Sequence, residues 1–148
     1  MRIYGHVSDH QALEWSWVDA RLNEAGTYWA TARTDGHPHP RPVWGVWASR
    51  CLHLSIGTPI TRAALALDPT VTIHLDSGTD VVIVEGRVVA STTDPDVIAA
   101  YDRKYDWTYD VEEFGSLICV APTAILAWQV TGWAGRGSFQ RSARWDFP

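Results

Sequence analysis

The most restrictive feature of this sequence is a row of three prolines, Pro38, Pro40 and Pro42, inside a stretch that otherwise has the composition of a β-strand. Residues two apart in a strand direct their amide groups to the same edge. Because proline has no N–H, all three missing donors lie on one edge, and only the opposite edge can pair fully. The sequence therefore predicts an edge that faces a loop, a ligand or another subunit.

These prolines lie in a predicted meander of three strands. Residues 27–34 are rich in β-branched and aromatic types, and Asp35-Gly36 supplies the positive φ angles that a tight hairpin requires. The second strand returns through the prolines to residue 47, and the third covers residues 52–56 and ends at Gly57. A polar loop follows, in which Thr58, Thr61 and Arg62 form a plausible cradle for an anion.

The rest of the chain adds short helices and further strands. A capping box at Ser16 predicts a helix that ends before Gly26, residues 61–67 predict a second helix, and Asp94-Pro95 begins a third. Further strands are expected at residues 70–75, 80–91, 116–120 and 123–130, the last two separated by Pro122. This order predicts one domain, residues 1–148, that folds as a mainly β, closed or nearly closed antiparallel barrel. An OB-type barrel is the competing topology.

Composition excludes several classes of function. A net charge of −5 argues against a nucleic-acid partner, which would require a basic face. No apolar run has the length of a membrane span and no signal peptide is recognisable, so the cytoplasm is the expected location. The single lysine, Lys104, makes Schiff-base catalysis improbable, and Cys51 and Cys119 are interpreted as buried thiols. His37 and His39 share a strand face but lack further ligands, so no metal site is expected.

Several segments, taken in order, resemble one known family. They are YWATARTDGHPHPRPVWGVW, DPTVTIHLDSG, VVIVEGRV, KYDW and ARWDF, and the likeness extends over residues 17–147. The pattern is similar to the pyridoxamine 5'-phosphate oxidase-like flavin-binding split barrels, and within them to small members that include deazaflavin-dependent oxidoreductases. This resemblance implies a six-stranded antiparallel split β-barrel with a few short helices, which forms a homodimer with its cofactor sites at the subunit interface.

The resemblance also implies a cofactor site. Two strand segments would lie along the cofactor ring, one with Arg41, Pro42, Val43 and Trp44 and the other with Ser55, Ile56 and Gly57. The following loop would hold the phosphate through Thr58, Thr61 and Arg62. Trp128 would either flank the ring from the partner subunit or fill the barrel. Spaced arginines such as Arg41, Arg62 and Arg144 could separately meet the phosphodiester and the carboxylate tail of a deazaflavin.

One departure from the family concerns the phosphate loop. Relatives commonly carry a Ser-Arg-Lys-Ala-Arg-Asn-Leu type of sequence where this chain has residues 59–65, so the usual lysine falls on Thr61 and two basic positions are apolar. We therefore expect this loop to bind the cofactor phosphate more weakly than the loop of its relatives does, or to bind it with residues at shifted positions.

The implied function is an oxidoreductase that transfers hydride to or from an unidentified small molecule with FMN or the deazaflavin coenzyme F420. No catalytic side chain and no metal are required, because the cofactor carries the reaction. Two alternatives stay open: a protein of the same fold that carries a flavin or haem without turnover, and a haem-degrading split barrel. The pyridoxamine 5'-phosphate oxidase reaction itself is not expected, because the chain is shorter than those enzymes.

Overall fold

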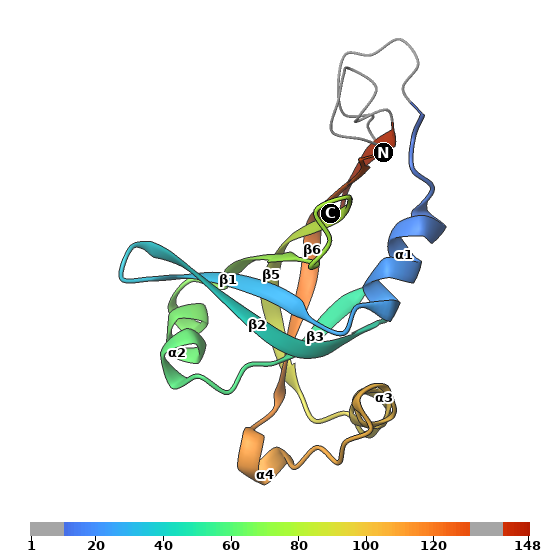
Figure 1. The fold of residues 1–148 in the computed structure, drawn as a ribbon. Coiled ribbons are helices and arrows are strands. Elements are labelled where there is room, and N and C mark those ends of the chain that lie inside the picture. Colours follow the sequence, from blue (N-terminus) through green and yellow to red (C-terminus); the bar gives the residue numbers. More distant parts are fainter. Residues whose placement is uncertain (1–10, 131–140) are drawn as a thin grey trace.

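A computed structural model describes residues 11–130 and 141–148. The described residues form one antiparallel sheet in the order β3-β2-β1-β4-β5-β6-β7, and β3 also pairs with β6. This second pairing closes six strands into a barrel and leaves β7 as an addition to β6 (Figure 1). The strands are β1 (Tyr28–Thr34), β2 (His37–Ala48), β3 (Cys51–Ser55), β4 (Thr70–His74), β5 (Asp80–Thr92), β6 (Leu117–Gln129) and β7 (Arg141–Asp146). The helices are α1 (Trp15–Glu24), α2 (Pro59–Leu67), α3 (Pro95–Tyr105) and α4 (Val111–Phe114). The expected six-stranded antiparallel barrel is confirmed, with one strand more.

The β1–β2 hairpin has the predicted turn. Asp35 and Gly36 take φ angles of 49° and 78°, so both central residues lie in the left-handed region that a two-residue hairpin needs. Residues 37–43 of β2 pair with β1, and pairing with β3 begins only at Trp44. Residues 37–43 therefore pair with β1 along one edge, and among the described residues no strand pairs with their other edge. This unpaired edge is the one on which the prolines lack N–H donors.

The interior of the barrel is a continuous apolar core. Alternate residues of neighbouring strands point inward, as in the row Ala30, Ile73, Val84 and Ile125, which are paired across β1, β4, β5 and β6 and all buried. Helix α1 adds Val18 and Leu22 to this core, because residues four apart lie on one face of a helix.

Two predicted helix starts are wrong. Helix α1 begins at Trp15 with Glu14 at its N-cap, and no side chain caps it, so the capping box at Ser16 does not form. Helix α2 begins at Pro59, two residues earlier than predicted, because the φ angle of proline already suits the first helical position. The residues expected to form a loop at the helix start are therefore inside the first turn.

The carboxyl-terminal strands also differ from the prediction. Residues 117–129 form one strand, β6, and Pro122 lies within it, opposite Gly86 and directly after a register shift between Glu85 and Gly86. The irregular pairing there tolerates a residue without an N–H, so the expected break does not occur. Strand β7 and the short helix α4 were not predicted.

A second apolar cluster lies outside the barrel. Val46 of β2 and Leu117 of β6 are buried under Tyr101 of α3 and Tyr109 of the segment that follows it. The barrel wall at Val46 of β2 and Leu117 of β6 is thus covered on both faces, by the core within and by the α3–α4 segment outside (Figure 1). In the part of the chain that is described, no helix combines the length and the apolar character needed to cross a bilayer.

Candidate functional site

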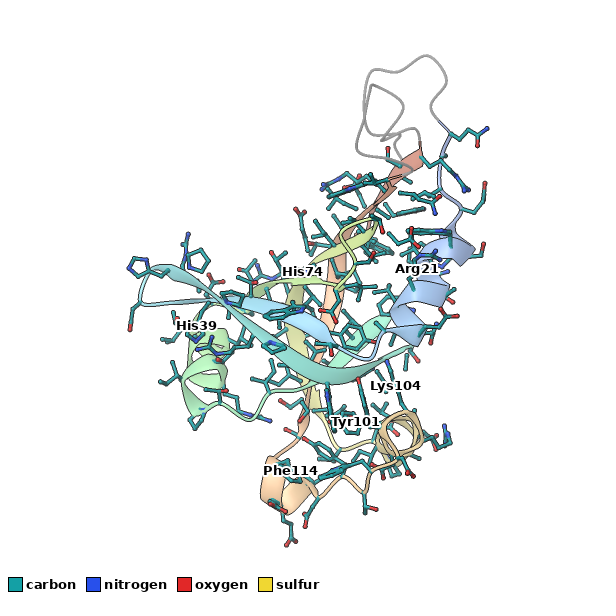
Figure 2. The ribbon with its side chains drawn as sticks, in the orientation of Figure 1. Arg21, His39, His74, Tyr101, Lys104 and Phe114 are labelled. Atoms are coloured by element: carbon teal, nitrogen blue, oxygen red, sulfur yellow. The ribbon has the colours of Figure 1, made fainter. Side chains whose placement is uncertain are left out.

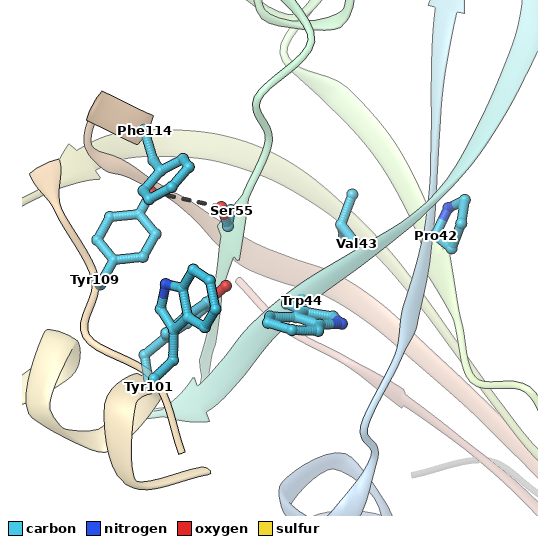
Figure 3. Close-up of a pocket in the computed structure, with 8 residues that line it drawn as sticks. Pro42, Val43, Trp44, Ser55, Tyr101, Tyr109 and Phe114 are labelled. Carbon is cyan, nitrogen blue, oxygen red and sulfur yellow. Dashed lines mark hydrogen bonds between the residues drawn. The ribbon is translucent and has the colours of Figure 1, made fainter. Parts of the chain in front are cut away.

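A cavity of about 280 Å³ lies between the outer face of β2 and β3 and the α3–α4 segment (Figure 3). It is lined by Pro42, Val43, Trp44, Ser55, Tyr101, Trp107, Tyr109 and Phe114. The first four of these are among the residues that the family resemblance placed along a cofactor ring. The structure brings Pro42, Val43 and Trp44 of one predicted segment and Ser55 of the other to one cavity, although the segments are not continuous in the sequence.

Trp44 forms an accessible aromatic wall of this cavity, and 44% of its surface is exposed. Its ring stacks on Tyr105 of α3 with centroids 4.6 Å apart and planes 4° from parallel, and Trp107 meets it edge-on at 6.1 Å. Such offset and edge-on pairs hold aromatic rings in defined orientations. Trp44 therefore presents a flat apolar surface whose orientation is fixed from the helix side.

Tyr105 ties α3 to the barrel next to this wall. Its hydroxyl accepts a hydrogen bond from the Gly45 N–H at 2.9 Å and lies 2.9 Å and 3.0 Å from the carbonyl oxygens of Gly45 and Gly26. Gly45 is required here because a Cβ at this position would lie 2.6 Å from the carbonyl oxygen of His53 on β3. The close approach of β2 and β3 thus depends on a residue without a side chain.

The inner end of the cavity carries three hydroxyl groups. Tyr109 donates to the Gly115 carbonyl at 2.9 Å, and the Ser55 hydroxyl lies 3.5 Å from the Tyr109 hydroxyl (Figure 3). Burial raises the pKa of Tyr101 to about 12, so this phenol stays neutral. None of the lining residues carries a formal charge at neutral pH. The cavity is therefore suited to a flat, uncharged part of a ligand that can exchange a few hydrogen bonds.

Aspartates hold the segment that carries Trp107, Tyr109 and Phe114. Asp94 caps α3 by accepting from the Asp96 N–H at 2.9 Å, and Asp106 ends the helix with a φ of 48°. Asp102 then accepts from the Tyr109 N–H at 2.8 Å, and Asp110 caps α4. The sequence analysis did not place this segment at the site. The signal in the sequence that could have identified this segment was its high density of aromatic residues between aspartates that cap helices.

The predicted phosphate residues are distributed differently. Thr58 and Gly57 are exposed, Ile56 is buried in the core, and Thr61 is buried inside α2 with a hydroxyl that has no partner among the described residues. Arg62 is half-buried, and its guanidinium faces backbone carbonyls. The loop therefore presents Thr58, rather than three convergent groups, at its surface.

Arg62 is bound by backbone carbonyls. Its Nε donates to the Ile56 carbonyl, and its Nη2 donates to Ser116 at 2.8 Å and to Phe114 at 3.3 Å. Gly115 lies against the guanidinium with a φ of 76°, and a Cβ there would approach Nη2 to 3.2 Å. Arg62 thus links the start of α2 to the α4–β6 junction, which forms part of the cavity rim.

Three other predicted residues lie away from the cavity in a single chain. Arg41 is exposed and donates to the Pro40 carbonyl at 3.0 Å. Arg144 pairs with Asp146 at 2.8 Å and with Glu85 at 3.5 Å. Trp128 lines a different cavity, of about 450 Å³. It lies on β6, ten residues from Ile118, which pairs with Leu54 next to Ser55 of the first cavity. This separation corresponds to roughly 30 Å along the strand. Trp128 and Arg144 could approach a ligand in the first cavity only from a second copy of the chain.

No metal-binding arrangement is found in residues 11–130 and 141–148, since no three His, Cys, Asp or Glu side chains are placed to share an ion. His37 and His39 lie on the outer half of the hairpin, the first exposed and the second half-buried. The site is therefore defined by aromatic and hydroxyl groups.

Comparison with known proteins gives a likeness of fold. No family model matches the chain, and no curated protein matches it in sequence. Among solved structures it is similar to an F420 reductase, with a TM-score of 0.61 and 19% identity over 72% of this chain and 94% of that one. An FAD-binding protein from Mesorhizobium loti aligns with a TM-score of 0.62 and 13% identity over 76% and 92%. A relative of general stress protein 26 from Clostridium acetobutylicum, described as of the pyridoxinephosphate oxidase family, aligns with a TM-score of 0.57 and 9% identity over 88% and 89%. The chain has the split-barrel fold of these proteins.

Proposed function

We propose that this chain is an oxidoreductase that binds FMN or the deazaflavin coenzyme F420 and transfers hydride to or from a small molecule. The observation that carries the proposal is the uncharged aromatic cavity, because residues predicted from the sequence to contact the cofactor ring meet there. The shared fold supports it, since proteins of that fold include ones named as an F420 reductase and an FAD-binding protein.

The residues present fit the ring of such a cofactor. Trp44 offers a flat face, and Ser55, Tyr101 and Tyr109 offer hydroxyl groups for the polar edge of a ring. A volume of about 280 Å³ accommodates a part of the cofactor and leaves the remainder outside, where the cavity opens beside Pro42 and Trp44. The ring would therefore be held by stacking and by neutral hydrogen bonds.

The phosphate end has fewer candidate contacts. Thr58 follows Ser55 by three residues, so it is at most about 11 Å away along the chain. Its hydroxyl makes no capping bond to α2, which leaves it available to a phosphate or phosphodiester. Because Arg62 is bound to carbonyls, we propose that the phosphate contributes less to affinity than the ring does.

The bound cofactor would supply the hydride chemistry. The chain would orient the ring through Trp44 and Tyr109, and the α3–α4 segment would exclude water from the covered face through Trp107 and Phe114. No residue of the cavity is positioned as a charged acid or base, so proton exchange is left to the cofactor, the substrate or solvent. The substrate would be a small molecule that reaches the exposed side of the ring.

We further propose that the active unit is a homodimer. One outer row of the sheet runs from Pro42, in the cavity wall, to Arg144 at the opposite edge. Its members are paired across six strands and are Pro42, Trp29, His74, Ile83, Leu126 and Arg144. The middle four are half-buried, with Trp29 stacked on His74 at 6.1 Å. A second copy packed on this face would cover the row and bring its Trp128 and Arg144 toward the cavity.

The proposal is tested by titrating the purified protein with F420, FMN and FAD while cofactor fluorescence and absorbance are followed. Replacing Trp44 with leucine removes the stacking wall and should weaken binding of the preferred cofactor about tenfold, the equivalent of about 1.4 kcal/mol. Trp17→Leu is the matched control, because Trp17 lies under Arg21 on α1 and lines no part of the cavity. Steady-state reduction of the bound cofactor then separates an enzyme from a carrier protein. Equal effects of the two substitutions would place the ring elsewhere.

A further inference from the structure

The two cysteines of the chain, Cys51 and Cys119, lie on neighbouring strands of the barrel. Strands β3 and β6 pair with His53 directly opposite Cys119. Cys51 is two residues before His53 and therefore lies on the same face of β3. The two cysteines are thus diagonal neighbours across the β3–β6 ladder, and their thiols share a hydrogen bond.

The two thiols point to the outer face of the barrel wall, because Leu52 and Val120, which alternate with them along the strands, belong to the core. They differ in access to solvent. Cys119 is buried, with 8% of its surface exposed, whereas Cys51 is only half-buried. Burial raises the pKa of Cys119 to about 11, so this thiol stays protonated and is a poor nucleophile by itself. A small oxidant therefore reaches Cys51 first.

His53 is a buried histidine with an unsatisfied ring nitrogen. Its surface is 7% exposed, and its Nδ1 has no hydrogen-bond partner among the described residues. Because His53 is directly opposite Cys119, their Cβ atoms are about 4.5–5.5 Å apart. On its other side His53 pairs with Val46, which is covered by Tyr101 of α3 (Figure 2). Burial lowers the pKa of His53, so the ring is neutral at neutral pH and can accept a proton.

An accessible thiol next to a buried one is the arrangement of a reactive cysteine with a resolving partner. We propose that Cys51 and Cys119 are a modification site at which a hydroperoxide produces a reversible disulfide, with His53 as the base.

The reaction has two steps. In the first, the Cys51 thiol loses its proton to solvent and its sulfur attacks the terminal oxygen of the hydroperoxide. The O–O bond breaks, Cys51 becomes a sulfenic acid, and the remaining oxygen takes a proton from solvent and leaves as an alcohol, or as water from hydrogen peroxide. In the second step, the Cys119 sulfur attacks the Cys51 sulfur while His53 takes the Cys119 proton. The sulfenic oxygen leaves with that proton as water, and the two electrons that the thiols lose have reduced the peroxide.

The geometry makes this disulfide easy to reduce. Diagonal neighbours in an antiparallel pair have Cα atoms about 7–8 Å apart, whereas an unstrained disulfide needs about 4.4–6.8 Å. Cys51 pairs with β2 but lies outside the β3–β6 pairs, and it directly follows the turn at Ser49 and Arg50, whose φ angles are 51° and 60°. This end of β3 must shift toward Cys119 to form the bond. The strain favours the thiol form, as in labile, regulatory disulfides.

The test treats the reduced, full-length protein with hydrogen peroxide. The wild type should lose two free thiols per chain, and mass spectrometry of unreduced peptides should find Cys51 linked to Cys119 within one chain, a link that dithiothreitol removes. Cys119→Ser should instead accumulate sulfenic acid on Cys51, which a dimedone-type trap labels. Cys51→Ser should oxidise at Cys119 at least about tenfold more slowly than the wild type reacts. Oxidation of Cys51 to sulfinic acid with Cys119 left as a thiol, or a link only between chains, would overturn the proposal.

The role of His53 is tested by measuring the two steps separately. His53→Gln should leave the formation of sulfenic acid on Cys51 within about twofold and slow formation of the disulfide at least about tenfold, so that more sulfenic acid is trapped. His37→Gln, at an exposed hairpin position, is the control and should change neither step. Thermal unfolding of each variant checks that the fold is kept, and the cysteine variants test the thiol pair independently of His53. If His53→Gln slows both steps equally, or neither, the assignment of His53 as the base is wrong.

Discussion

The contacts of Arg62 lead to a sharp prediction, because sequence and structure give this residue different roles. From the sequence it was a phosphate ligand, whereas in the structure its Nε and Nη2 donate to carbonyls of Ile56, Phe114 and Ser116. The perturbation is Arg62→Met, which keeps the length of the aliphatic stem and removes the donors. It separates a role in stability from a role in binding.

The magnitude follows from the bonds that are lost. Hydrogen bonds to a charged group contribute about 1.5–3 kcal/mol each, and two of the three are well formed here. Because the guanidinium is only partly buried, water can reach some of the abandoned carbonyls, and the loss should be about 2–3 kcal/mol in free energy of unfolding. For a chain of this size that is a fall in Tm of about 5–10 °C. Arg33→Met, on an exposed strand position, should change stability by less than about 0.5 kcal/mol.

Urea unfolding followed by tryptophan fluorescence measures the first effect, and cofactor titration well below the transition measures the second. The structural role predicts a loss of stability with cofactor affinity changed less than about threefold. A direct charge-assisted contact to phosphate would instead weaken binding roughly tenfold to a hundredfold. An unchanged Tm together with such a loss of affinity would refute the structural reasoning and restore the prediction made from the sequence.

Three further predictions concern the rest of the molecule. Light scattering at micromolar concentration should give about twice the chain mass of 16.5 kDa, and a clean monomer would contradict the shared interface. Gly45→Ala should destabilise the protein by about 1–3 kcal/mol in urea unfolding, since the added Cβ would lie 2.6 Å from the His53 carbonyl oxygen; a neutral effect would mean that β2 and β3 can separate freely. The hydrogen bond from Arg21 lowers the pKa of Asp80, so this carboxylate stabilises the fold above its unfolded pKa of about 3.9, and the stability is lost as pH falls through the lower folded pKa. Asp80→Asn should therefore cost stability at neutral pH, modestly because both side chains are about one-third exposed, and the difference from wild type should vanish once the pH is below the lowered pKa of Asp80.

The parts of the fold that sequence reasoning predicted are those fixed by local chemistry. Asp35-Gly36 determines the hairpin through its backbone angles, and Asp94-Pro95 starts α3 with a cap that the structure contains. The start of α2 was misplaced because Thr61 and Arg62 look like loop residues until Pro59 is recognised as a first helical position. At the site, Pro42, Val43, Trp44 and Ser55 of the two predicted segments line one cavity, and their contact with a cofactor stays a prediction.

The remainder of the site depends on contacts between distant segments. Trp107 and Phe114 reach the cavity because α3 docks on β2 through Tyr105, sixty residues away from Gly45. The orientation of the Arg62 side chain likewise depends on its hydrogen bond to the Ser116 carbonyl, a contact that no sequence pattern predicts. Strand β7 is short and follows residues outside the described part, so its pairing with β6 could be recognised only in three dimensions.

The proline edge of β2 has a consequence for how this protein can aggregate or assemble. Figure 1 shows the β1–β2 hairpin projecting from the barrel as an arm, a shape that elsewhere invites an extra strand. Along the free edge of residues 37–43, Pro38, Pro40 and Pro42 present carbonyl oxygens without any N–H, so an incoming chain would find acceptors and no donors. The sheet therefore cannot be extended from this edge by further hydrogen-bonded strands, as happens in fibrils or when an extended peptide adds a strand. A partner that binds the arm must use side chains on its faces, and within residues 11–130 and 141–148 no strand extends the sheet beyond this edge.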